Sequence, residues 1–98
     1  MTISGPASNT SWNETLKLVY FAWVRERIGV AQEEVTPPES VTTVRDLLEW
    51  LRSRGEQYAE ALKFPDAIRV AINQEHAGHD ERIAGAREIG LFPPMTGG

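Results

Sequence analysis

The sequence contains no cysteine, no excess of basic residues and no long hydrophobic run. Disulfides, cysteine metal sites and cysteine nucleophiles are therefore excluded, and the lack of cysteine fits a reducing compartment. Ten Lys and Arg against fourteen Asp and Glu give a net charge of -4, without the basic cluster typical of nucleic-acid binding. No apolar run approaches the roughly 20 residues of a membrane span, and the start lacks the features of a secretory signal. We therefore expect a cytoplasmic protein without nucleic-acid or membrane partners.

The composition fits one folded domain preceded by a polar segment. The chain has 98 residues, of which 41% are hydrophobic and 24% charged, close to ordinary globular values. A chain of this length supports one hydrophobic core. Residues 1–15 are rich in Ser, Thr and Asn, which predicts a flexible tail. Residues 16–98 are expected to form the domain.

Hydrophobic patterning predicts several strands. The first would occupy residues 16–24, where β-branched and aromatic residues are frequent, followed by a short helical turn that Gly29 ends. Ile68, Val70 and Ile72 alternate with more polar residues, which indicates a half-buried strand. Further strands are predicted over residues 32–36 and 88–92, with a turn and a short strand within 73–78 and a loop over 79–87.

One amphipathic helix stands out in the middle of the chain. Thr43 with Asp46 resembles a capping box, and an apolar stripe at helical spacing follows. The stripe consists of Val44, Leu47, Leu48 and Leu51. Gly55 is expected to end this helix, and residues 58–62 suggest a second, shorter one. One helix stripe and several strands predict an α+β fold with a sheet packed on one main helix.

The C-terminal sequence Phe-Pro-Pro-Met-Thr-Gly-Gly carries the clearest chemical signal. The carboxylate of Gly98 can be activated as an acyl adenylate without any side-chain chemistry. Gly97 and Gly98 lack a Cβ, so this end can thread a narrow active-site channel. Pro93 and Pro94 fix φ just upstream and hold the tail away from the sheet. A flexible end without function is the simpler interpretation of two terminal glycines.

Three stretches resemble the MoaD/ThiS family of sulfur carriers, and in particular the small subunits of molybdopterin synthase. They are Val-Tyr-Phe-Ala-Trp-Val-Arg-Glu at 19–26, Val-Ala-Ile-Asn-Gln at 70–74 and the C-terminal sequence at 92–98. The resemblance spans residues 16–98 and implies a ubiquitin-like β-grasp fold with a flexible Gly-Gly tail. The third stretch is the most specific, because it combines composition, order and position.

The resemblance implies a sulfurtransferase role as the sulfur-donating subunit of the synthase. A ubiquitin-activating type of adenylyltransferase would adenylate Gly98 with ATP, and a sulfur donor would convert it to a thiocarboxylate. The carrier would then deliver sulfur to precursor Z (cyclic pyranopterin monophosphate) inside the large subunit, forming the molybdopterin dithiolene. The family assembles as a heterotetramer in which each of two large subunits binds one carrier. No cofactor and no metal would be bound by the carrier itself.

The family's partner-facing surface corresponds here to a small set of residues around the tail. These are Phe21, Arg25, Phe92, Pro93, Pro94 and Thr96. Core packing is the alternative for the two phenylalanines, and a solvated charge is the alternative for the arginine. His76 stands where the family often has an apolar residue. With His79 and Asp80 it could suggest a metal site, but a solvated loop is the preferred interpretation.

Three other functions stay open from the sequence. The first is a sulfur carrier for thiazole, cysteine or tRNA thiolation, against which the Phe-Pro-Pro-Met-Thr sequence argues. The second is a ubiquitin-like modifier that forms isopeptide bonds through Gly98 after the same adenylation. The third is a β-grasp interaction module whose terminal glycines are incidental.

Overall fold

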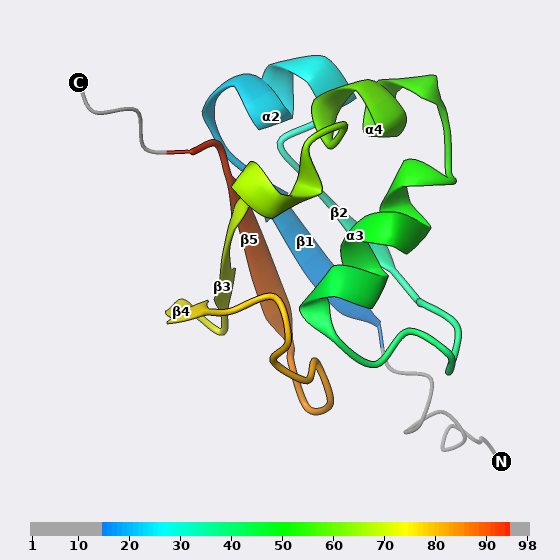
Figure 1. Ribbon diagram of the computed structural model, residues 1–98, viewed down its shortest axis with the longest axis vertical. Helices are drawn as coiled ribbons and strands as arrows, with labels where there is room; N and C mark the ends of the chain where they lie inside the picture. Colours follow the sequence, from blue (N-terminus) through cyan, green and yellow to red (C-terminus); the bar gives the residue numbers. More distant parts are fainter. Residues whose placement is uncertain (1–14, 95–98) are drawn as a thin grey trace, which may run out of the picture.

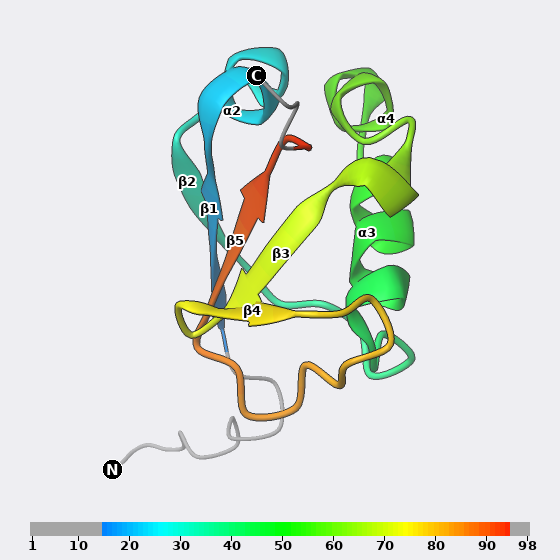
Figure 2. The same ribbon diagram turned by 60° about the vertical axis from the view of Figure 1, so that its left-hand side comes forward.

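A five-stranded mixed sheet carries all the helices on one face. The computed structural model describes residues 15–94. The strands, in spatial order, are β2 (Gln32–Val35), β1 (Leu16–Tyr20), β5 (Glu88–Phe92), β3 (Arg69–Ile72) and β4 (Glu75–Ala77). The central pair, β1 and β5, is parallel, and every other pair is antiparallel. The helices are α2 (Ala22–Ile28), α3 (Val44–Arg52), α4 (Glu56–Ala61) and the 3-10 turn η2 (Pro65–Ala67). Figures 1 and 2 show the sheet on one side and α3 and α4 on the other.

Strand alternation divides the sheet into a core face and an open face. Along β1, Leu16, Leu18 and Tyr20 are buried, whereas Lys17 and Val19 are half-buried on the opposite side. The side chains between sheet and helices are Leu16, Leu18, Tyr20, Val24, Ile28, Val35, Val44, Leu47, Leu48, Leu51, Tyr58, Ala61, Leu62, Ile68, Val70, Ile89 and Leu91. This is the ubiquitin-like β-grasp, as expected. Residues 1–14 and 95–98 lie outside the described part, so the predicted flexible tail over residues 1–15 stays a prediction.

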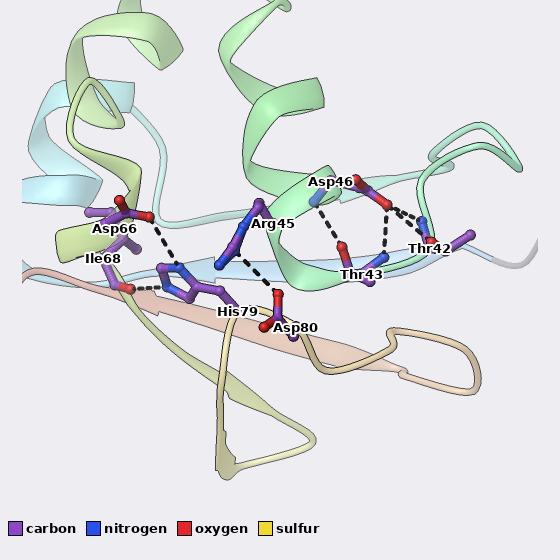
Figure 3. A network of polar contacts seen from close by, with 8 residues as sticks. All are labelled: Thr42, Thr43, Arg45, Asp46, Asp66, Ile68, His79 and Asp80. Carbon is purple, nitrogen blue, oxygen red and sulfur yellow. Dashed lines mark hydrogen bonds and ion pairs between the residues drawn. The ribbon is translucent and has the colours of Figure 1, made fainter.

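The main helix α3 begins at the predicted capping box. The Asp46 N–H donates to Thr43 Oγ1 at 3.1 Å, and the Asp46 carboxylate accepts from the Thr43 N–H at 3.2 Å (Figure 3). The predicted apolar stripe is buried. The prediction that Gly55 ends the helix is wrong, because the last helical residue is Arg52 and Ser53 is the C-cap. Gly55 instead precedes α4 as its N-cap.

The first strand is shorter than the sequence suggested. It ends at Tyr20 and not at residue 24, because Val24 belongs to α2. The turn of the chain occurs at Ala22, whose φ of 53° lies in the left-handed region. Val24 and Ile28, four residues apart, then pack into the core from α2. The strand propensity of residues 21–24 does not decide their structure, because packing of Val24 against the core outweighs the intrinsic preference of these residues. Gly29 ends the helix as predicted, with a φ of 101°.

The β3–β4 hairpin explains the Asn-Gln pair of the second family stretch. Asn73 and Gln74 both have positive φ, 50° and 73°, as a two-residue type I′ turn requires. The Asn73 side-chain oxygen also accepts from the N–H groups of Arg87 and Glu88, at 2.9 and 3.0 Å. Asn73 therefore joins the hairpin to the start of β5.

Replacing Gln74 by glycine is expected to stabilise the protein. Glycine adopts the left-handed conformation without the steric penalty that a Cβ imposes, and it is the preferred second residue of this turn. We expect the free energy of unfolding to rise by about 0.5–1 kcal/mol in a urea titration. Gln57→Gly inside α4 is the control and should destabilise, because that residue is helical. A loss of stability in Gln74→Gly would contradict the strain argument.

A carboxylate at the sheet edge receives two tyrosine hydroxyls. Tyr20 and Tyr58 both donate to Oε2 of Glu33, at 2.7 and 2.6 Å, and Arg54 Nη1 lies 3.6 Å from Oε1. Burial by itself would raise the pKa of the Glu33 carboxyl. The hydrogen bonds from the two tyrosines and the charge of Arg54 outweigh burial and hold that pKa below its ordinary value. The network ties β1 and β2 to α4.

This network predicts a stability that depends on pH. Because the pKa of Glu33 is lowered in the folded state, its contribution is complete above the unfolded-state pKa of about 4.3 and is lost as pH falls through the folded-state pKa. Glu33→Gln should therefore lower the free energy of unfolding by about 1–2 kcal/mol at neutral pH. The difference in free energy of unfolding between Glu33→Gln and the wild type should disappear in acid. Glu39→Gln, at an exposed carboxylate, is the matched control in the same urea titrations. If this difference stays constant with pH, the stabilisation does not come from the Glu33 carboxylate.

Candidate functional site

Two phenylalanines are stacked where the central strands end. The ring centroids of Phe21 and Phe92 are 4.3 Å apart and the ring planes differ by 2°. Phe21 directly follows β1, and Phe92 is the last residue of β5, the strand parallel to it. The Phe21 N–H donates to the Leu91 carbonyl at 3.1 Å, which fixes the side-by-side placement. Phe21 is 38% exposed, so core packing does not explain this residue. We call Phe21 and Phe92 the aromatic pair.

A glycine beneath the aromatic pair allows the rings to lie close to the sheet. A Cβ on Gly90 would lie 3.2 Å from Cε2 of Phe21 and 3.2 Å from Cε1 of Phe92. Either distance is shorter than an ordinary van der Waals contact, so a side chain here would push both rings outward. Gly90 is thus a positioning residue for the aromatic pair. Sequence reasoning missed it, although strand alternation places residues 90 and 92 on one face.

An open groove extends from the aromatic pair across the open face of the sheet. Its floor contains the small residues Gly90 and Ala71, which are paired across β5 and β3. Arg69, Pro93 and Pro94 also line it. Arg69 is paired in register with Phe92, so it lies next to the aromatic pair on the same face. Sequence analysis did not single out Arg69, because only the strand pairing brings it to this place.

The structure brings together most of the predicted partner-facing residues. Phe21, Phe92, Pro93 and Pro94 line one groove. Arg25 is exposed on α2, and its N–H donates to the Phe21 carbonyl at 3.4 Å, so both residues share one side of the helix start. The predicted residues Thr96, Gly97 and Gly98 lie outside the described residues. Aromatic rings and prolines offer a docking surface but no nucleophile and no proton to transfer, so the chemistry must come from another group.

His79 and Asp80, which follow β4, have different partners. His79 Nε2 lies 2.8 Å from the Ile68 carbonyl, and its Nδ1 lies 3.9 Å from Asp66 (Figure 3). Asp80 instead pairs with Arg45 at 3.3 Å. His76 is exposed on the edge strand β4 and lines the groove. Within residues 15–94, no three potential ligands gather in a way that could hold a metal ion, and no helix could cross a membrane.

The fold and the position of the groove define the class of the protein. A β-grasp domain with this strand order, whose last strand ends at the aromatic pair, belongs to the ubiquitin-like proteins. Residues 18–98 match the ThiS family, and the chain belongs to that family. The family membership expected from the three sequence stretches is thereby confirmed.

One relative and two solved structures are similar to this chain over most of its length. The chain is 31% identical over 83 residues to the molybdopterin synthase sulfur carrier subunit of Escherichia coli, a match that covers 85% of this chain and 99% of that protein. A putative molybdopterin converting factor, subunit 1, from Pyrococcus furiosus has a TM-score of 0.65 at 30% identity, covering 83% and 98% of the two chains. The H. volcanii small archaeal modifier protein 1 has a TM-score of 0.63 at 28% identity, covering 83% and 98%.

Proposed function

We propose that this protein is the sulfur carrier subunit of a molybdopterin synthase. Its role would be to carry sulfur as a thiocarboxylate on Gly98 and to donate it to precursor Z. The observation that carries the proposal is the segment from Phe92 to the terminal glycines, which leaves the central strand at the aromatic pair. The name of the E. coli relative and the family membership support it.

The proposed reaction begins at the terminal carboxylate. An oxygen of the Gly98 carboxylate attacks the α-phosphorus of ATP on an activating enzyme, and pyrophosphate leaves. A hydrosulfide equivalent from a sulfur donor then attacks the acyl carbon, and AMP leaves, which yields the thiocarboxylate. Inside the large subunit, the thiocarboxylate sulfur attacks a carbon of precursor Z and displaces an oxygen leaving group, which gives a thioester between the carrier and the substrate. Water then hydrolyses this thioester, so that the sulfur stays on the product and the Gly98 carboxylate is regenerated. ATP would thus be handled by the partner and not by this chain.

The described residues would contribute to docking. The aromatic pair offers an apolar surface beside Pro93 and Pro94, and such a surface is the usual centre of a protein interface. Pro93 and Pro94 restrict φ where the chain leaves the sheet, so less conformational entropy is lost when the tail enters a channel. Arg25 would pair with a charge of the partner, and Thr96 with Gly97 would contact the channel. The two-carrier heterotetramer is part of the same proposal.

The test is the intact mass of the protein after incubation with its activating enzyme, ATP and a sulfur donor. A gain that equals one oxygen replaced by sulfur is the expected result. Addition of the large subunit and precursor Z should then reverse the gain and produce molybdopterin. If the mass does not change with an activating enzyme proven on another carrier, the proposal is wrong.

A protein modifier is the second candidate function. The structural similarity to the H. volcanii small archaeal modifier protein favours it, since both uses of a terminal glycine begin with adenylation. A modifier would appear as conjugates, in which Gly98 is joined to lysine side chains of other proteins. Peptide mass spectrometry of cell extract distinguishes the two, because a sulfur carrier leaves the thiocarboxylate form and no such branched peptides.

A further inference from the structure

One arginine is close to each member of the aromatic pair. Arg25 lies four residues after Phe21 on α2, where its backbone N–H donates to the Phe21 carbonyl, and Arg69 is the cross-strand partner of Phe92. Because the strand order is β1, β5, β3, Arg69 lies on the side of Phe92 away from Phe21. Both arginines are exposed, and neither forms an ion pair or a side-chain hydrogen bond with another of residues 15–94.

The other charges of the open face do not neutralise this pair of arginines. Lys17 has acidic neighbours in register on both sides, Glu34 on β2 and Glu88 on β5. That row lies at the other end of the strands from the aromatic pair. Asp66 also lines the groove and is the nearest acid in sequence to Arg69, but its carboxylate is turned toward His79 at 3.9 Å. Two positive charges that form no ion pair with the rest of residues 15–94 thus lie near the aromatic pair, on a protein of net charge -4.

We propose that Arg69 is a second cationic anchor of the docking surface, and that the protein accepting the tail presents carboxylates at two points beside an apolar pocket. The proposal rests on the proposed function and adds the partner's chemistry. Guanidinium groups bind carboxylates through two parallel hydrogen bonds, which fixes direction as well as charge. Two such contacts, one near each ring of the aromatic pair, would set a single orientation of the carrier. The carrier would then not need to rotate on the partner's surface before its tail enters the channel.

The test measures binding of the carrier to the large molybdopterin synthase subunit of the same organism. Arg69→Gln should raise the Kd about threefold and Arg69→Glu about tenfold or more at low ionic strength. In about 1 M NaCl, where the Debye length is about 3 Å, wild type and variants should converge. Arg82→Glu is the matched control, since it makes the same charge change at an exposed arginine in the 79–87 loop, outside the groove.

Other outcomes would contradict the anchor proposal, alone or together with the synthase assignment. Arg69→Glu with wild-type affinity at low salt, or with a loss equal to that of Arg82→Glu, would overturn the anchor while leaving the carrier function intact. If the wild-type chain forms dimers in sedimentation and Arg69→Glu is a monomer, the face binds a second copy and the anchor proposal is wrong. Thiocarboxylate formation without any binding of the wild type to the large subunit would overturn both the anchor and the synthase assignment.

Discussion

Adding one residue after Gly98, or deleting Gly98, should abolish thiocarboxylate formation. Either change moves the carboxylate by about 3.5 Å along the chain. A misplacement of about 1 Å at a reacting centre can cost about 100-fold in rate, so a loss beyond 100-fold is expected. An added residue other than glycine also carries a Cβ, which Gly97 and Gly98 lack. The measurement is the intact-mass gain with activating enzyme, ATP and sulfur donor.

The control for the terminal variants is a chain with one residue added before Met1. It has the same length as the extended variant, and its tail is unchanged, so it should gain mass at the wild-type rate. All three chains should unfold at the same urea concentration. Thiocarboxylate formation on the extended chain at the wild-type rate would show that Gly98 is not the group that is activated.

Removing either ring of the aromatic pair should weaken docking strongly. Phe21→Ala and Phe92→Ala are each expected to cost about 2 kcal/mol of binding, or roughly 30-fold in Kd for the large subunit. Because the rings are stacked on each other, the double variant should lose less than the sum of the two single losses. Isothermal titration calorimetry of the three variants measures both effects.

The matched control for the aromatic pair is Phe64→Ala. Phe64 is 70% exposed and does not line the groove, so its removal should leave the Kd unchanged. The unfolding temperature of each variant separates docking from folding, since Phe21 is itself 38% exposed. If Phe64→Ala and Phe21→Ala weaken binding equally, the partner covers a different surface.

Much of the fold could be predicted because its signals are local in sequence. The capping box of Thr43 and Asp46 acts within one helical turn, and the stripe of α3 needs only helical periodicity. The last strand was predicted with its observed ends, residues 88–92. The boundary between β1 and α2 was not predicted correctly, because it depends on the left-handed backbone at Ala22 and on the packing of Val24 into the core.

The candidate site, like the fold, could be predicted only in part from the sequence. By itself, the sequence predicted the chemistry of the C-terminus, since composition and order near the chain end carry it. It predicted Phe21, Arg25 and Phe92 as partner-facing residues through the resemblance of residues 19–26 and 92–98 to the family. Only the tertiary structure decided that the two rings stack, that Gly90 lies beneath them and that Arg69 flanks them. These placements depend on the parallel pairing of β1 with β5 and on the register of β3. Such pairing joins residues far apart in the chain, and its register is set by burial of one sheet face in the common core, which no local pattern specifies.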